Sequence, residues 1–448
     1  MQDSFTEYYR CPSQYSIFAA RQPLSQESGY FRFGTETAYG QSASAVPAVS
    51  AEGILPDLTP LVGHEEGRVV LPFDVDQIVE NLRSESYAAP GRASWQVLHN
   101  LYYGLRPFMP VSLRRHLQKI YLSDWRKIAF PHWPVECAVD NVLESVMALA
   151  IGRTALKRIP FIWFWPQGAP ACAILTHDVE TSTGRDYCPA LMDLDESFAF
   201  KASFQFVPEV RYEVSDSLLQ SVRDRGFEIC VQDLNHDGQL YHDEKQFRRR
   251  ARSINRYAKA WGARGFRSAV LYRRQQWFDA LEFDYDMSVP NVGRLDPQRG
   301  GCCTVMPYFI GSLLELPVTT TQDYSLFHVL GDYSIELWKQ QIEKIVERHG
   351  LLNFIIHPDY IRGTREQNTI KQLLSNLSTS RAQSNLWTPT PGEVARWWRE
   401  RSKMSIVEQS GVARIQGEGS ERAQIAYASV EGGRVVYRIG EKAAARAN

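Results

Sequence analysis

The stretch Ala171-Cys172-Ala173-Ile174-Leu175-Thr176-His177-Asp178-Val179-Glu180 runs from small apolar residues directly into ionisable ones. Pro166, Gly168 and Pro170 precede the apolar run, so the pattern predicts a buried strand of a parallel sheet. The ionisable residues would then stand at the carboxyl end of the strand, where α/β folds place their chemistry. In an extended chain Asp178 and Glu180 point to one side and His177 to the other. The alternative is that these residues only open a surface loop.

The region around this stretch alternates between apolar runs and helical patterns. Helices are predicted over Leu191–Phe198, Ser215–Arg225, Asp243–Trp261 and Ser334–His349. Strands are predicted over residues 171–176, 201–207, 227–231, 265–270, 283–289, 312–317 and 352–356. Strands that alternate with helices indicate βα units and a parallel sheet, hence an α/β fold. Seven strands suit a closed or nearly closed barrel, and an open doubly wound sheet is the alternative.

The flanking regions have a different character, and four regions are predicted. Residues 1–60 form a poorly ordered or docked segment, and residues 61–165 form a helical accessory region that includes a basic helix over Ser112–Tyr121. Residues 166–403 hold the α/β barrel. Residues 404–448 form a small β appendage and a tail from Glu441. The appendage is suggested by apolar and polar residues that alternate around glycine-rich turns.

The composition of the 448 residues is that of an ordinary globular protein, with 44% hydrophobic and 23% charged residues. A net charge of −1 gives no electrostatic support for nucleic-acid binding. The seven cysteines are scattered without a CxxC pair, which favours a reducing compartment. No signal peptide and no stretch long enough to span a bilayer is visible, so the expected location is cytoplasmic. The oligomeric state is open.

Four predicted strands end in polar residues. They carry Asp178, His236, Arg267 and His357. Parallel strands gather their carboxyl ends at one face, so these side chains are expected to converge there. A carboxylate base, an imidazole acid and a guanidinium suit hydrolysis, with or without a metal. Taken singly, His236 could hold a turn, Arg267 could be a structural ion-pair partner and His357 could simply end a strand.

These motifs, in this order, resemble those of the polysaccharide deacetylase family, the NodB-homology domains, over roughly residues 165–380. The family's Thr-Phe-Asp-Asp motif is similar to the segment from Thr176 to Val179. Its Glu-Ile-Gly motif followed by His-x-x-x-His is similar to the segment from Glu228 to His236. Arg267 and the pair His357-Pro358 match its later motifs, and Leu314 to Pro317 followed by Gln322-Asp323 looks like the strand before its last motif in one bacterial branch.

The resemblance implies a distorted (β/α)7 barrel that removes acetyl groups from sugars with a divalent metal such as zinc. By the resemblance, Asp178 would be the catalytic base or a metal ligand, Arg267 would orient that carboxylate, and His357 would be the general acid. His236 would be a metal ligand. Val179 replaces the second adjacent carboxylate of the family, and Glu180 could supply it, because it points to the same side as Asp178.

The main departure is Gln232, which stands where the family has its first metal-binding histidine. A glutamine offers only a neutral carbonyl oxygen, a poor ligand for zinc-like ions. The implied metal site is therefore Asp178, Glu180, Gln232 and His236, with His177, Asp233 and His242 as nearby residues that could compensate. Loss of metal binding, and of activity, is an alternative outcome.

Three functions follow. The first is a hydrolase that removes an acetyl group from an amino sugar, saccharide or glycan precursor by metal-assisted or carboxylate-activated attack of water. The second is a catalytically degenerate protein that binds a glycan or a partner. The third is a metal-independent amidase on the same fold, acting on a small amide or ureide.

Overall fold

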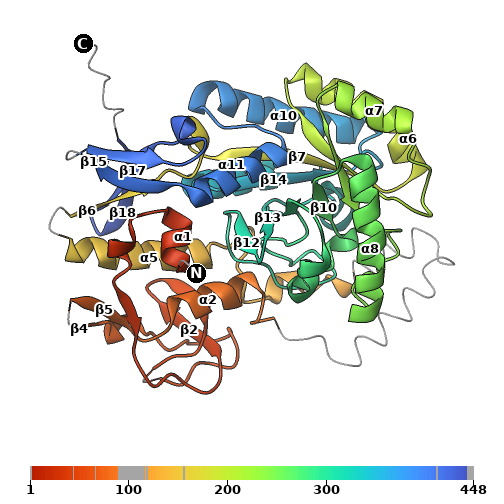
Figure 1. Cartoon of the computed structure of the whole chain (residues 1–448). Coiled ribbons are helices and arrows are strands. Elements are labelled where there is room, and N and C mark those ends of the chain that lie inside the picture. Colours follow the sequence, from red (N-terminus) through yellow and green to blue (C-terminus); the bar gives the residue numbers. More distant parts are fainter. Residues whose placement is uncertain are drawn as a thin grey trace, which may run out of the picture. The chain divides into compact units, whose positions relative to one another are not determined.

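The chain forms two compact units, each built from separate stretches of sequence (Figure 1). The computed structural model describes residues 3–43, 45–65, 67–88, 117, 120–154, 157–409 and 412–440. Unit 1 comprises Met1–Tyr87, Cys137–Pro170 and Arg396–Asn448, and unit 2 comprises Ala88–Glu136 and Ala171–Ala395. The predicted helix over Ser112–Tyr121 lies almost wholly outside the described residues, and the tail from Glu441 lies wholly outside them.

Unit 2 is organised around an eight-stranded sheet with the order β12-β13-β11-β10-β9-β8-β7-β14. Seven of these strands are parallel, and only β12 is antiparallel to its neighbour. The strands are β7 (Cys172–Val179), β8 (Ala202–Phe206), β9 (Glu228–Gln232), β10 (Gly265–Arg267), β11 (Tyr285–Asp286), β12 (Tyr308–Ile310), β13 (Leu313–Glu315) and β14 (Leu351–Ile356). All seven predicted strands are present, and the sequence missed only the short antiparallel β12.

Side-chain hydrogen bonds span the space between β13 and β14, where no backbone ladder forms. Thr319 Oγ1 donates to the carbonyl of Leu351 at 2.6 Å, and Thr320 Oγ1 donates to the carbonyl of Asn353 at 2.7 Å. The amide of Asn353 in turn donates to the carbonyl of Leu316 at 3.0 Å. The sheet is therefore a distorted (β/α)7 barrel that side chains close, which confirms the predicted fold class.

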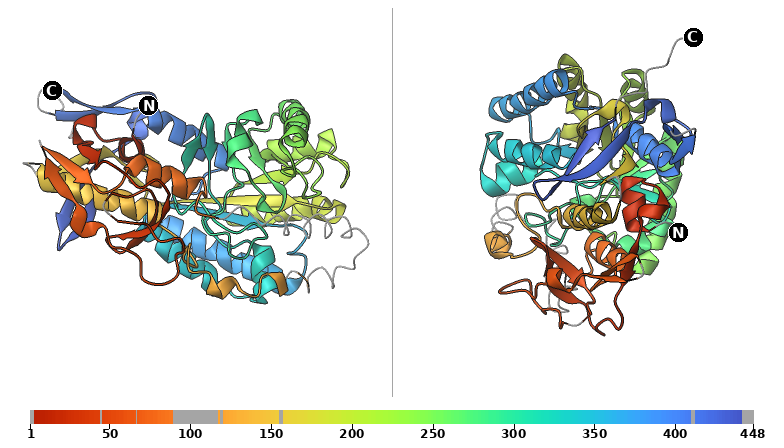
Figure 2. Two further views of the ribbon diagram at one scale, coloured as in Figure 1. Left: turned by 90° about the horizontal axis from the view of Figure 1, so that it is seen from below. Right: turned by 90° about the vertical axis from the view of Figure 1, so that its left-hand side faces the viewer.

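Helices surround the strands of unit 2 on more than one side (Figure 2). They are α6 (Ser182–Ser197), α7 (Asp216–Asp224), α8 (Glu244–Trp261), α9 (Glu336–Glu347), α10 (Thr364–Ser384) and the first part of α11 (Pro391–Lys403). Local capping sets their limits: Ser215 and Asp243 accept backbone N–H groups at the starts of α7 and α8, and Gly262 ends α8 with φ 61°. These signals were readable in the sequence.

Strand β7 is the central element of this unit, since it pairs with β8 on one side and β14 on the other. All eight of its residues are buried. The small residues Cys172 and Ala173 and the branched Ile174 fit a strand covered on both faces. This burial brings Thr176 and Asp178 into the interior at the carboxyl end of the strand.

Unit 1 combines helices with small sheets, whose strand pairs are antiparallel except for the parallel pair β1–β5. Its helices are α1 (Ser4–Tyr9), α2 (Val75–Arg83), α5 (Ala138–Arg153) and the end of α11. Its strands are β1 (Phe18–Ala20), β2 (Gly29–Phe33), β3 (Glu36–Gly40), β4 (Gly63–Glu65), β5 (Arg68–Leu71), β6 (Arg158–Ile162), β15 (Ser405–Gln409), β16 (Val412–Gln416), β17 (Ile425–Glu431) and β18 (Arg434–Ile439). Buried rings gather in its core, where Tyr9 contacts Phe161 at a centroid distance of 5.5 Å.

The predicted helical region over residues 61–165 is a mixture in the part that the structure describes. It contains α2 and α5, but also strands β4, β5 and β6. Strands β5 and β6 are only four and five residues long, too short for periodicity to separate strand from helix. The strand pairing also crosses the predicted boundary at residue 404. Strand β17, which follows that boundary, pairs with β6 before it as well as with β18.

Within the described ranges, no helix combines the length and apolarity that a membrane span requires.

Candidate active site

Six side chains selected from the sequence stand at or just beyond strand ends in unit 2. They are Asp178 on β7, Glu180 after it, Gln232 on β9, His236 after it, Arg267 on β10 and His357 after β14. Five of the six residues are at most 4% exposed, whereas the side chain of Glu180 is 19% exposed. Glu180 is thus the member that solvent reaches most easily.

Asp178 is held by donors on both carboxylate oxygens. Arg267 Nη1 donates to Oδ1 at 2.9 Å, and the amide of Gln232 donates to Oδ2 at 3.1 Å. Gln232 and Arg267 are register partners on β9 and β10, so the sheet itself directs both donors to the same carboxylate. Arg267 is fixed further by its bonds to Thr176 Oγ1 and to the carbonyl of Met287.

Glu180 stands between two imidazoles and a phenol. Its Oε1 lies 2.9 Å from His236 Nε2 and 3.7 Å from His357 Nε2, and its Oε2 accepts from Tyr360 at 3.2 Å. The His236 contact lies off the direction of a good hydrogen bond, so it is chiefly an electrostatic approach. Burial opposes ionisation of Glu180, but the nearby His236, His357 and Arg211 lower its pKa well below the ordinary value.

His357 is paired with a buried aspartate that the sequence did not assign to the site. Its Nδ1 lies 2.6 Å from Asp323 Oδ1, and its backbone N–H donates to Asp323 Oδ2 at 2.7 Å. Burial alone would lower the pKa of His357, yet the charge and hydrogen bond of Asp323, together with Glu180 and Asp178, raise it to about 10. His357 is therefore protonated at neutral pH, with Nε2 directed toward Glu180.

The structure thus brings all six predicted residues into one neighbourhood. Asp178 and Glu180 both act on the pKa of His357, and Glu180 also contacts His236. Arg267 and Gln232 both bond to Asp178.

Arg211 fixes the orientation of the His236 ring. Its Nη2 lies 3.1 Å from His236 Nδ1, and a guanidinium can only donate, so Nδ1 presents its lone pair there. The ring proton of a neutral imidazole then resides on Nε2, facing Glu180. His236 itself has a left-handed backbone with φ 54°, which is strained for a residue with a side chain.

This arrangement does not fit the predicted divalent metal. A ligating imidazole needs a free lone pair, but Nδ1 of His236 lies 3.1 Å from the Arg211 guanidinium and Nε2 lies 2.9 Å from Glu180. Both oxygens of Asp178 already accept hydrogen bonds. Among the described residues no group of three or more His, Cys, Asp or Glu side chains could hold a metal ion.

The three residues considered as compensating ligands make other contacts. His177 is on the other face of β7, where its Nε2 lies 2.8 Å from Asp195. Asp233 uses Oδ1 to accept the N–H of Leu234, and His242 lies next to Asp243 at 3.4 Å. None of them contributes to a ligand set.

The contributions of Asp323, Tyr360 and Arg211 were not predicted from sequence. Asp323 was noted only as part of a pair that follows a predicted strand. Its contact with His357 joins residues 34 positions apart, and no local pattern signals such a contact.

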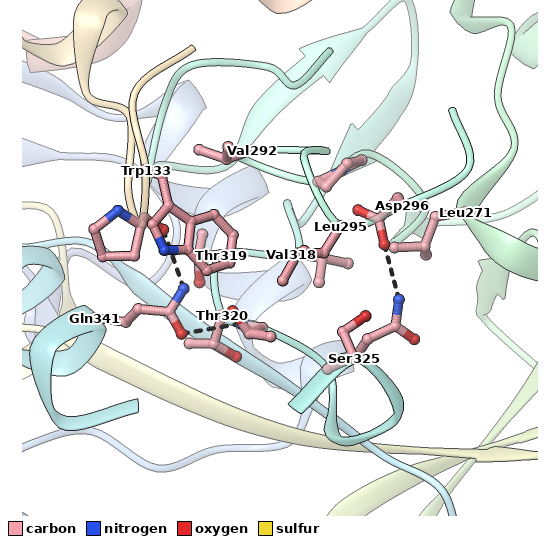
Figure 3. A pocket seen from close by; sticks show the side chains of 14 residues that line it. Trp133, Leu271, Val292, Leu295, Asp296, Val318, Thr319, Thr320, Ser325 and Gln341 are labelled. Carbon is pink, nitrogen blue, oxygen red and sulfur yellow. Dashed lines mark hydrogen bonds between the residues drawn. The ribbon is translucent and has the colours of Figure 1, made fainter. Parts of the chain in front are cut away.

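Unit 2 also contains a small pocket (Figure 3). Its cavity volume of about 20 Å³ has room for about one water molecule. Gln341 spans one side by accepting from the N–H of Thr321 at 3.0 Å and donating to the carbonyl of Pro134 at 3.1 Å. Gln322 and Ser325 line the pocket on either side of Asp323, whereas none of the six predicted residues lines it. The chemistry is therefore assigned to the six residues and not to this pocket.

Comparison with known proteins finds structural likenesses, while no family model and no curated protein matches the chain. A protein described as a polysaccharide deacetylase from Mycobacterium smegmatis is 18% identical over 53% of this chain and 93% of its own, with a TM-score of 0.44. The Puue allantoinase is 14% identical over 52% and 92%, with a TM-score of 0.42. A family 4 carbohydrate esterase from Streptomyces lividans is 11% identical over 49% and 92%, with a TM-score of 0.32. Since each TM-score is below 0.5, the function of this chain is inferred from its own residues.

Proposed function

We propose that this chain is a hydrolase that removes an acetyl group from an amino sugar or glycan, using water activated by a carboxylate. The observation that carries the proposal is the His357–Asp323 pair, which leaves Nε2 of the imidazole facing the carboxylate of Glu180 at 3.7 Å. An acid and a base held close together in a largely buried site are what amide hydrolysis requires. The resemblance of the sequence motifs to those of polysaccharide deacetylases supports an acetylated saccharide as the substrate.

The steps follow from the contacts. Asp178, oriented by Arg267 and Gln232, takes a proton from a water molecule whose oxygen attacks the carbonyl carbon of the acetamide. Arg267 Nη2, which has no hydrogen-bond partner, is the donor available to the developing oxyanion. His357 then gives its Nε2 proton to the departing nitrogen as the C–N bond breaks, and acetate and an amine leave. No step requires the predicted metal.

A second candidate is the metal-independent hydrolysis of a small amide or ureide. The burial of the site favours it, because Asp178, Gln232, His236, Arg267 and His357 are each at most 4% exposed. A small substrate enters such a site more readily than a polymer does.

The test measures acetate release from N-acetylglucosamine oligomers, and amine or ammonia release from small amides, with and without a chelator. Turnover of the oligomers that a chelator does not affect, and that His357→Gln abolishes, is the expected result. His242→Gln serves as the matched control, since the side chain of His242 is 40% exposed and its Nδ1 lies 3.4 Å from Asp243.

Other outcomes have defined meanings. Turnover of small amides alone supports the second candidate. Turnover that disappears with a chelator contradicts the metal-free route. If the wild-type chain releases neither product, and the Gln232→His variant gains metal binding and activity, the chain is a degenerate glycan-binding protein. The hydrolase proposal is then wrong.

A further inference from the structure

A row of paired positions crosses the sheet from the candidate base. Asp178 is the register partner of Gln205, Gln205 of Cys230, Cys230 of Gly265, and Gly265 of Tyr285. Residues paired in this way point to the same face of a sheet. The row therefore begins at Asp178 and continues over five strands on the interior face that bears the site.

Gly265 leaves room for Tyr285, at the far end of this row, to reach Cys230 in the middle. A Cβ atom at position 265 would lie 2.2 Å from Cε2 of Tyr285, so the tyrosine ring occupies the space that a side chain would need. The ring brings its hydroxyl to 3.2 Å from Cys230 Sγ. The same hydroxyl donates to Glu228 Oε2 at 2.9 Å.

Gln205, which lies between Cys230 and Asp178 in the row, is hydrogen-bonded within β8. Its amide donates at 2.6 Å to the hydroxyl of Ser203, which lies close enough to Cys230 to lower the pKa of the thiol. Burial raises the pKa of Cys230 to about 12, so this thiol is a protonated hydrogen-bonding link and not a nucleophile.

Glu228 closes the chain at the opposite end of β9 from the site. Its carboxyl group accepts from the hydroxyl of Thr390 at 2.7 Å and from the N–H of Gly392 at 2.8 Å. Gln205, Ser203, Cys230, Tyr285 and Glu228 together form what we call the interior column. Such a column is unusual, because the interior of a barrel is ordinarily filled by branched apolar residues.

Two departures from the resembled family's motif lie on this column or beside it. Cys230 stands where Glu-Ile-Gly has glycine, and Gln232 stands where the family has histidine. They are two residues apart on β9 and so share a face. Gln232 bonds to Asp178, and the Arg267 guanidinium is close enough to act on the pKa of Cys230.

We propose that the interior column is a positioning network that holds Gln232 and Arg267 against Asp178. The proposal rests on the hydrolase function proposed above. Gln205 is the register partner of Asp178, and Cys230 lies two residues before Gln232 on the same face of β9, so the column packs directly against the groups that hold the carboxylate. The column residues do not touch the substrate, and they act through the orientation of the groups that do.

The test removes one link and keeps the packing. Tyr285→Phe retains the ring over Gly265 but loses the hydroxyl, and Cys230→Ala loses the thiol. Each is expected to lower kcat about tenfold, the effect of about one hydrogen bond, with KM changed less than about twofold. Cys230→Ser keeps a hydroxyl in the chain and is expected to recover most of kcat.

Tyr241→Phe is the matched control, because the hydroxyl of this buried tyrosine has no hydrogen-bond partner. Its kcat is expected to stay unchanged. If Tyr285→Phe lowers only the melting temperature and leaves kcat at the wild-type value, the column is merely structural and the proposal is overturned.

A crystal structure of Tyr285→Phe separates this proposal from the hydrolase function. A displaced Gln232 amide or Arg267 guanidinium at Asp178 supports the network even if no substrate is turned over. An unchanged arrangement around Asp178 overturns it, whatever the activity.

Discussion

At the residue scale, the contacts of Asp178 show how Gln232 is accommodated at the position where the resembled family has a metal-binding histidine. The Gln232 amide donates to one oxygen of the buried carboxylate. Arg267 supplies the positive charge. The carboxylate is thereby stabilised by protein groups alone.

Asp323→Asn is expected to move the alkaline limb of the pH–rate profile to lower pH. His357 must be protonated to act as the acid, so the rate falls as pH rises through its pKa of about 10. Removing Asp323 takes away the largest influence that raises this pKa, while burial continues to lower it. The limb is expected to shift by more than about one pH unit. Acetate release between pH 5 and pH 11 measures the shift, and an unmoved limb would show that His357 is not the acid.

The same pair affects stability. Because the folded state raises the pKa of His357 from 6.5 to about 10, its contribution is fully present below about pH 6.5 and is lost as pH rises through about 10. The free energy of unfolding of Asp323→Asn should therefore depend less on pH over that range than that of the wild type.

Arg267→Met is expected to lower the free energy of unfolding by about 3–5 kcal/mol, since it leaves a buried carboxylate without its cation. The side chains of Arg267 and Asp178 are 0% and 5% exposed. Urea unfolding measures the loss. The double variant Arg267→Met with Asp178→Asn should recover much of it, and a double variant as unstable as the single one would mean that lost packing, not the unpaired charge, is the cause.

At the scale of the element, β10 shows how one small residue sets the spacing between strands. Gly265 has no left-handed backbone that would require glycine, so its role is steric. The Tyr285 ring from β11 fills the space above it.

Gly265→Ala is therefore expected to destabilise the chain by about 1–3 kcal/mol through overpacking. Thermal or urea unfolding tests this. Gly152→Ala in α5 is the control: a Cβ there meets nothing within 4 Å, so alanine should be neutral or stabilising by about 1 kcal/mol. Adding Tyr285→Leu to Gly265→Ala should relieve the clash, and if it does not, the overpacking explanation fails.

At the scale of the whole molecule, unit 1 depends on segments that lie far apart in the sequence. β6, from residues 158–162, pairs with β17, from residues 425–431. The hydroxyl of Tyr9 lies 2.8 Å from that of Tyr437 on β18. The Tyr437 ring also contacts the Phe161 ring, at a centroid distance of 5.2 Å.

A chain that ends at Lys403 is expected to lose these partners and to melt at least about 5 °C lower, with exposed aromatic surface that binds a hydrophobic dye. A chain that ends at Gly440 keeps all four C-terminal strands and serves as the control. Equal melting temperatures for the two truncated chains would show that β15 to β18 contribute nothing to the stability of unit 1.

The sequence by itself determined the seven parallel strands, the extents of α7 and α8 and the strand ends that carry Asp178, Gln232, Arg267 and His357. Those features depend on local patterns: apolar runs, capping residues and polar residues directly after a strand. The tertiary structure alone decided that Asp323 holds His357, that Arg211 occupies His236, and that Tyr285 reaches over Gly265 to Cys230. Contacts between strands depend on register and on side chains far apart in the chain, and neither leaves a periodic trace in the sequence.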